Sequence, residues 1–288
     1  MMPFKKILPT ICVVFLICAN SPALTVALKP DKNPGAMAEE RGRLEDFLSS
    51  RLGVVCKVVV PMSAAVIHTG LDAGTIDVAF VSATDLLIVE NKYSAKFLAN
   101  VLVDGSATYR SLWLVRAEDP AIAIADLRGH KIAFSSRTST SGYIVPMRGL
   151  YLQGFLRPGQ QAEEFFGAGN VVFSTGYVGA VELLLRGDVR AAAVSDYVYH
   201  KDKHLNSDQK SRLRVLAEAG RVPVHVLAAS GATPQELLSQ FLGAILELNH
   251  ADHAALRDAV FGGEITTVRD VEAHEQLKNA LIELKILE

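Results

Sequence analysis

The sequence has little cysteine and no excess of positive charge. Cys12 and Cys18 lie in an N-terminal segment typical of an export signal, so Cys56 alone remains in the mature chain and no internal disulfide can form. The 288 residues carry 29 Lys and Arg against 31 Asp and Glu, a net charge of -2. Because nucleic-acid binding depends on basic side chains that neutralise phosphates, this balance argues against a nucleic-acid partner. Any anion site must therefore be local.

The motifs of common enzymes and metal sites are also absent. We find no GxSxG elbow for a nucleophilic serine, no GxxxxGK[ST] loop for phosphoryl transfer, and no CxxC or HExxH pair. The eight histidines are scattered without the spacing of metal ligands, and Cys56 lies in an apolar run, where a free cysteine is usually a small hydrophobic residue. We therefore expect no enzymatic activity, no cofactor and no metal site.

The first residues have the pattern of a signal peptide. Lys5 and Lys6 precede an apolar run over residues 7–17, and small residues follow up to Ala23. We expect an exported protein cleaved after Ala23, with a net charge of -2 - 2 = -4 once both lysines are lost. Lipid attachment at Cys18 is the minor alternative, because the residue before it is not small.

Short β-branched runs alternate with helical stretches along the mature chain, and they do so in two series. This pattern predicts an α/β fold with parallel strands, since parallel neighbours need helical crossovers. Turn residues at 104–106 and 219–221 indicate two crossings between lobes. The predicted division is a signal peptide at 1–23, a first lobe at 24–108 plus 228–288, and a second lobe at 109–227.

The most informative stretch covers residues 126–146. An apolar strand at 131–134 is followed by a hydroxyl-rich turn that opens a helix, and this turn contains Ser139, Thr140, Ser141 and Gly142. The first amides of a helix lack intrahelical partners and carry partial positive charge, so they can hold an anion. The hydroxyls add donors, and Gly142 would let a ligand approach the backbone. An ordinary N-cap is the alternative, because Ser and Thr are common caps in any protein.

The order and spacing of several motifs resemble the periplasmic phosphate-, phosphite- and phosphonate-binding proteins of ATP-driven importers. The Ser-Thr-Ser-Gly-Tyr turn at 139–143 resembles the family's anion-holding turn, and Gly-Thr-Ile-Asp-Val-Ala at 74–79 resembles its G-x-x-D-x-A motif. Residues 44–60, 109–115 and 184–197 agree in the same order, so the resemblance covers nearly the whole mature chain. It implies a two-lobed type II periplasmic binding fold with the ligand cleft between the lobes.

The resemblance also implies roles for single residues. Ser139, Thr140 and Ser141 match the turn that holds the oxyanion. Asp196 matches a cleft aspartate that would accept hydrogen bonds from the ligand, although a capping or surface aspartate fits its sequence position equally well. Tyr177 stands where relatives often have histidine; it could donate a hydrogen bond or serve only as a core or rim aromatic.

The first lobe departs from the family pattern. Ser63 stands where a tyrosine is usual, and the segment at 82–86 replaces a glycine-proline pair and a further tyrosine. The aromatic wall expected around a phosphonate substituent is thus missing there, and Ser82 and Thr84 offer hydroxyls instead. Asp85 would repel an anion unless it turns away or accepts a proton. Arg137 could add charge beside the turn, but long cationic side chains on loops are usually solvated.

The predicted function is capture of a small oxyanion, namely a phosphonate, phosphite or phosphate, in the periplasm for a membrane ABC permease. The alternative is a sensor accessory of the same fold that binds another oxyanion, such as arsenite or arsenate, and signals to a membrane receptor. Fold alone does not separate these functions.

Overall fold

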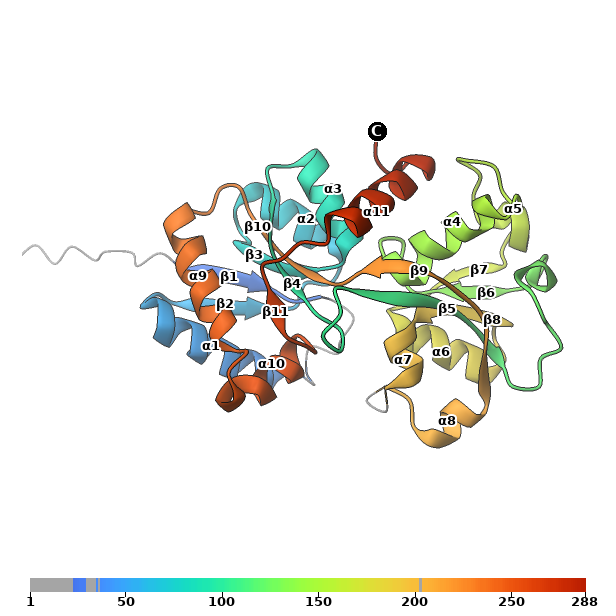
Figure 1. Ribbon diagram of the computed structural model, residues 1–288, viewed down its shortest axis with the longest axis horizontal. Coiled ribbons are helices and arrows are strands. Elements are labelled where there is room, and N and C mark those ends of the chain that lie inside the picture. The colour runs from blue at the N-terminus through green and yellow to red at the C-terminus, as the bar shows by residue number, and fades with distance from the viewer. Residues whose placement is uncertain (1–22, 30–34, 36, 202–203) are drawn as a thin grey trace, which may run out of the picture.

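The computed structural model describes residues 23–29, 35, 37–201 and 204–288. The predicted signal segment, with Cys12 and Cys18, lies outside these ranges. Within them the protein has two β-sheets, each covered by helices on both faces, in two lobes that lie side by side (Figure 1). The predicted α/β class is confirmed. In the described ranges, no helix combines the length and apolar character needed to cross a bilayer.

The first-lobe sheet has six strands in the order β11-β4-β10-β3-β1-β2. Strand β1 pairs in parallel with β2 and β3, whereas β10 runs antiparallel to β3 and β4. Most of its strands are short apolar runs, as expected for a sheet covered on both faces. The strands are β1 (Leu24–Ala27), β2 (Cys56–Val59), β3 (Val78–Val81), β4 (Lys96–Val101), β10 (Val226–Ala229) and β11 (Ile265–Thr266).

Helices α1, α9 and α10 pack on one face of this sheet, and α2 and α3 pack on the other. Helices α2 and α3 begin directly after the parallel strands β2 and β3, so their N-termini lie at the carboxyl ends of those strands. The helices are α1 (Ala38–Leu52), α2 (Ala64–Ala73), α3 (Ala83–Lys92), α9 (Gln235–Glu247), the short η3 (Ala251–His253), α10 (Ala254–Val260) and α11 (Val271–Glu283).

The second-lobe sheet has five strands in the order β7-β6-β8-β5-β9. Strand β6 is parallel to β7 and β8, and β5 is antiparallel to β8 and β9. The strands are β5 (Thr108–Arg116), β6 (Ile132–Phe134), β7 (Val171–Phe173), β8 (Ala191–Ser195) and β9 (Leu213–Pro223). The helices are η1 (Ile124–Leu127), η2 (Thr140–Ile144), α4 (Val145–Leu152), α5 (Glu163–Phe166), α6 (Tyr177–Arg186), α7 (Asp196–His200) and α8 (Ser207–Ser211).

The chain passes between the two sheets at the β4–β5 and β9–β10 connections. These segments run side by side, because the Val101 amide donates to the His225 carbonyl at 2.9 Å and the Val224 amide donates to the Ala107 carbonyl at 3.2 Å. The predicted lobe boundaries stay a prediction. Val226 and Leu227, which that prediction placed in the second lobe, pair with β3 in the first sheet.

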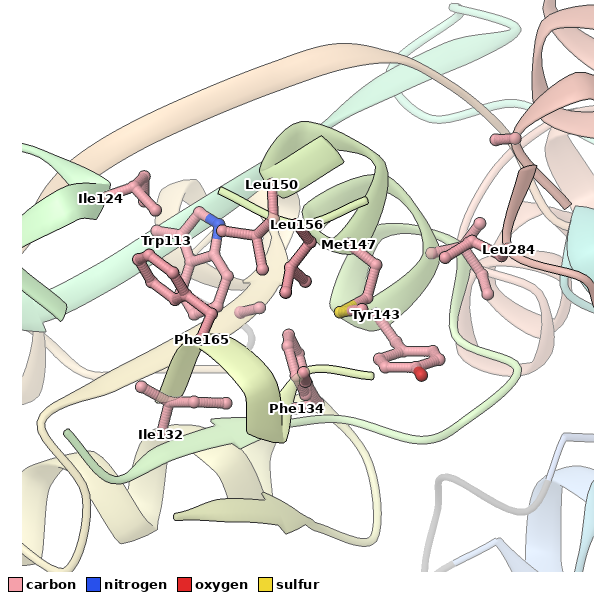
Figure 2. Packing of buried hydrophobic residues seen from close by; sticks show 14 of the residues in the cluster. Trp113, Ile124, Ile132, Phe134, Tyr143, Met147, Leu150, Leu156, Phe165 and Leu284 are labelled. Carbon is pink, nitrogen blue, oxygen red and sulfur yellow. The ribbon is translucent and has the colours of Figure 1, made fainter. Parts of the chain in front are cut away.

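Helix α11 follows the first-lobe sheet in the chain but packs mainly against the second lobe. Its residues Leu277 and Leu281 share a buried cluster with Trp113 and Phe134 of the second sheet and with Leu87 of α3. Figure 1 shows this helix between the two lobes, and Figure 2 shows the cluster with Leu284, which follows α11, at its edge. A single apolar cluster therefore joins elements of both lobes.

Candidate functional site

A cavity of about 280 Å³ lies between the lobes at the ends of the parallel strands. We call it the serine-lined cavity. Its first-lobe lining is Lys29, Met62, Ser63, Ala64, Ile67, Val81, Ser82, Asp85 and His225, and its second-lobe lining is Ser135, Ser136, Thr138, Ser139, Ser174, Thr175, Gly176 and Tyr177. Hydroxyl groups predominate among these polar side chains. The lining comes from both lobes, so the cavity exists only while the lobes are together.

Four helix N-termini meet at this cavity. Ser63 caps α2, Ser82 caps α3, Ser139 caps the turn that leads into α4, and Gly176 precedes α6. All four of these residues line the cavity. Each helix N-terminus carries unpaired amides and about half a positive charge, so the cavity has a positive potential from the backbone alone. An oxyanion is the ligand class that such a cavity favours.

The predicted anion turn is a π-helical turn, η2, which continues directly into α4. Such turns are rare and often occur at functional sites. The Ser139 hydroxyl accepts a hydrogen bond from the Gly142 amide at 3.0 Å, so Ser139 is an N-cap as well as a cavity residue. The two interpretations of this residue are compatible.

The Tyr177 hydroxyl contacts two serine hydroxyls of this turn. Its oxygen lies 3.3 Å from Ser139 Oγ and 2.9 Å from Ser141 Oγ. Ser141 is fully buried behind the cavity wall, and its carbonyl accepts a hydrogen bond from Ser111 Oγ at 2.6 Å. Ser139 and Tyr177 thus face the cavity, whereas Ser141 positions the Tyr177 hydroxyl.

Thr84 and Thr140 lie against each other across the two lobes rather than in the lining. Their hydroxyl oxygens are 3.0 Å apart, the Thr84 amide donates to Thr140 Oγ1 at 3.3 Å, and both residues are buried. A second contact between the lobes brings Ser82 Oγ within 3.1 Å of the Thr138 carbonyl, which shares the single hydroxyl proton of Ser82 with Asp85. These bonds hold the N-terminus of α3 against the start of η2.

Gly142 is required by packing inside the turn. A β-carbon built there would lie 2.4 Å from Ser135 Oγ and 2.8 Å from Ser139 Oγ, too close for any side chain. Gly142 does not line the cavity. Close packing against Ser135 and Ser139 is therefore an alternative reason for a glycine at this position, beside its predicted role of letting a ligand approach the backbone.

Asp85 lines the cavity with both carboxylate oxygens occupied. One oxygen lies 2.9 Å from His68 Nε2, and the other accepts a hydrogen bond from Ser82 Oγ at 2.6 Å. Both oxygens therefore have hydrogen-bond partners within the first lobe, and the expected repulsion of an anion by Asp85 stays a prediction. The serine hydroxyl donates to the aspartate and not to the histidine, which differs from the Ser-His-Asp order of a nucleophilic triad.

Asp196 lies at the start of α7, outside the lining of the serine-lined cavity. One of its carboxylate oxygens accepts a hydrogen bond from the Arg110 amide at 3.0 Å, and the other is buried with no partner among the described residues. Burial raises the pKa of this carboxyl group above its ordinary value. Its role in ligand binding stays a prediction.

Two ionisable residues of the lining, Lys29 and His225, were not predicted from the sequence. Lys29 follows β1 and His225 precedes β10, and the Lys29 ammonium contacts His225 Nε2. The pair is 196 residues apart in the chain, so only the sheet order brings it together. The available signal was a lysine at the end of a buried strand, where ligands bind in α/β proteins.

Other candidate groups lie elsewhere. The Arg137 guanidinium lies over the Phe173 ring at 4.2 Å and does not line the cavity. Cys56 is buried in β2, and burial raises the pKa of its thiol. Over the described part of the chain, no three His, Cys, Asp or Glu side chains are grouped to hold a metal ion.

A family model and a curated relative both match this chain. A family model described as the periplasmic substrate-binding protein of a phosphonate ABC transporter matches residues 26–276. The phosphate-import protein PhnD of Mycolicibacterium smegmatis is 26% identical over 223 residues, which cover 75% of this chain and 69% of that protein.

Solved structures share the architecture. PhnD1 of Prochlorococcus marinus in complex with methylphosphonate is 18% identical with a TM-score of 0.76, over 91% of this chain and 98% of that chain. The binding protein of a Pseudomonas aeruginosa ABC phosphonate transporter is 14% identical with a TM-score of 0.77, over 91% and 87% of the two chains. These likenesses confirm the type II periplasmic binding fold.

Proposed function

Since this chain belongs to the periplasmic substrate-binding proteins of phosphonate ABC transporters, we propose that it captures a phosphorus oxyanion in the serine-lined cavity. Family membership makes the protein a substrate-binding component and not an enzyme, implies a periplasmic location, and gives it a small anion as ligand and a membrane permease as partner. Cleavage after Ala23 concerns residues outside the described ranges and stays a prediction.

The convergence of four helix N-termini on one cavity carries the proposal. The caps Ser63 and Ser82 come from the first lobe, and Ser139 and Gly176 come from the second. A tetrahedral oxyanion has three or four oxygens that each accept hydrogen bonds, and such a cavity offers hydroxyls on both sides of it. Lys29 adds a formal positive charge.

The ligand class we propose is phosphonate, phosphite or phosphate. A relative named for phosphate import and a solved relative in complex with methylphosphonate support this class. The hydroxyl-rich wall of Ser82 and Ser139 suits a ligand head that both accepts and donates hydrogen bonds, as a partly protonated phosphorus oxyanion does.

Capture follows from the two-lobed design. The cavity is lined from both lobes, and in the part of the chain that the structure describes the two sheets are connected at two neighbouring segments. Rotation of the lobes about these segments would open the cavity, and a bound oxyanion would hold the lobes together by bridging their helix ends. The closed, liganded form is then the form that a permease can distinguish.

Thermal-shift titration of the mature protein tests the proposal. The panel is phosphate, phosphite, methylphosphonate, aminoethylphosphonate, sulfate, arsenite and arsenate. A specific ligand at 100 times its Kd adds about 2.7 kcal/mol to the free energy of unfolding, so at least one phosphorus oxyanion should raise the melting temperature clearly. A response confined to arsenite or arsenate would favour the sensor alternative, and a flat response to every anion would contradict both.

A matched pair of variants locates the site. The double variant Ser139→Ala/Tyr177→Phe removes two hydroxyls that face the cavity and should abolish the ligand-induced shift while leaving a cooperative unfolding transition. Ser239→Ala removes an exposed hydroxyl from α9, distant in the chain and outside the lining, and should respond to ligand as the wild type does. Retained binding in the double variant would place the site elsewhere.

A further inference from the structure

A second and larger cavity, of about 590 Å³, adjoins the serine-lined cavity. The two cavities share Lys29 and His225 in their lining and no other described residue. We call the larger one the aromatic chamber, because its wall includes Phe80, Tyr197, His204, His225 and Phe261. It is built from the first-lobe sheet, the crossing segment after β4, helix α7 and the end of α10.

The rings of this chamber form a connected group. The His225 ring lies 5.6 Å from Phe80 and 6.4 Å from Tyr197, and Tyr197 lies 5.9 Å from His204. Tyr109 stacks on His225 at 6.1 Å with an interplanar angle of 11°. Aromatic residues held against one another in this way present a pre-formed surface for another ring.

Two cations of the chamber already have acidic partners. Lys201 lies 2.8 Å from an Asp104 oxygen, and Arg257 lies 2.8 Å from an Asp258 oxygen. All four of these residues line the chamber. A second anionic group on the ligand would have to compete with these carboxylates, so an uncharged ring suits the chamber better than a charged chain.

Lys29 lies at the boundary between the two cavities. Its ammonium contacts His225 Nε2 and lies 6.0 Å from the Phe80 ring. The lysine side chain is a flexible stem with a mobile charge, so an oxyanion in the serine-lined cavity would draw the ammonium away from His225. That movement would join the two cavities along the face of the imidazole.

From this arrangement we infer that the protein binds phosphorus oxyanions that carry an aromatic substituent. The oxyanion lies among the helix N-termini with Lys29, and the ring lies in the aromatic chamber against Tyr197 and His225. This inference rests on the proposed function, since it extends the same ligand beyond the serine-lined cavity. The aromatic wall that the family pattern places around Ser63 and Asp85 is missing there. In this protein the aromatic chamber, on the other side of the Lys29–His225 contact, would take its place.

Isothermal titration with methylphosphonate and phenylphosphonate tests the inference on the mature protein. The two ligands share the oxyanion and differ in the ring. Burial of a phenyl ring removes apolar surface from water, so we expect phenylphosphonate to bind about tenfold more tightly or better. If methylphosphonate binds and phenylphosphonate binds no more tightly, the aromatic chamber takes no part and the inference is wrong, while the proposed function stands. If neither ligand nor any other phosphorus oxyanion binds, the proposed function fails.

Variants of the chamber wall separate the ring from the oxyanion. Tyr197→Ala should make the affinities for the two ligands similar while leaving that for methylphosphonate nearly unchanged. Tyr199→Ala should keep the wild-type ratio, because Tyr199 lies on the same helix and packs against the same second-lobe core but does not line the chamber. Should Tyr197→Ala not fold, Glu264→Trp adds bulk from an exposed lining position and should weaken phenylphosphonate alone. Equal loss of both ligands in these variants would overturn the inference.

Discussion

Lys29 brings a formal positive charge into a cavity whose polar lining consists mostly of hydroxyl groups. In the sequence it is one lysine among many, and only its position after a short apolar run marks it. Strand order in the first sheet places β1 two positions from β10, which brings His225 beside it. The serines and threonines of the turn could therefore be predicted as candidate site residues from the sequence, but Lys29 could not.

Replacement of Lys29 by methionine should weaken oxyanion binding about 10- to 100-fold, because a hydrogen bond to a charged group contributes about 1.5–3 kcal/mol. Isothermal titration with methylphosphonate measures the loss. Lys92→Met removes the same charge from an exposed position at the end of α3 and should leave the affinity unchanged. Equal affinities in the two variants would show that Lys29 does not contact the ligand.

Asp196 should make stability depend on pH in a defined direction. Burial raises the pKa of its carboxyl group above the ordinary value of 3.8, so the folded state binds a proton more readily than the unfolded state does. The contribution of Asp196 to the free energy of unfolding is therefore most favourable in acid, and it falls as pH rises from about 3.8 through the raised pKa.

Chemical denaturation of wild type and Asp196→Asn across this window measures the effect. The difference in unfolding free energy between the two proteins should shift in favour of the asparagine variant as pH rises. A shift in the opposite direction would show that burial does not raise the pKa of the Asp196 carboxyl group.

Among the elements, α3 and the η2 turn show how the structure reassigned predicted site residues. Ser82, Thr84, Thr140 and Ser139 were all expected to offer hydroxyls to a ligand. The structure places Ser82 and Ser139 in the cavity lining and buries Thr84 against Thr140. A hydroxyl can cap a helix, bridge two elements or bind a ligand with the same chemistry, so the sequence predicts its presence but not its partner.

The buried threonine pair should stabilise the contact between the two elements. Thr84→Val keeps the side-chain shape but removes the hydroxyl partner of Thr140, and we expect a loss of about 1–2 kcal/mol in the free energy of unfolding. Thr69→Val removes an exposed hydroxyl from α2 and should change stability much less. Urea denaturation compares the two, and an equal effect would mean that the buried pair contributes nothing specific.

For the whole molecule, α11 connects the lobes through packing as well as through the chain. The chain order predicts that residues after 228 belong to the first lobe, yet Leu277 and Leu281 lie in the cluster with Trp113. An amphipathic helix shows in its sequence which face is apolar, but it does not show which of two apolar surfaces it will cover. Opening of the cavity must therefore separate α11 either from α3 of the first lobe or from β9 and α4 of the second lobe.

Leu281→Ala should destabilise the second lobe although it lies near the chain end. A buried leucine replaced by alanine costs about 2–5 kcal/mol, and amide hydrogen exchange should rise in β5 and β6. Leu248→Ala is the matched control, because Leu248 is equally buried in the first-lobe core, and it should raise exchange in β1 and β3 instead. The same exchange pattern in both variants would show that the lobes unfold as one unit.

The sequence by itself determined the α/β class, the two series of elements and the hydroxyl-rich capped turn at Ser139, because strand and helix periodicity and capping chemistry are local properties of the chain. Tertiary structure alone decided the rest: the meeting of four helix N-termini, the Lys29–His225 contact, the burial of Thr84 and Thr140, and the position of α11. Each of these depends on sheet order and on the approach of two lobes. Such long-range pairings are set by the total packing of both cores, and no local pattern encodes them.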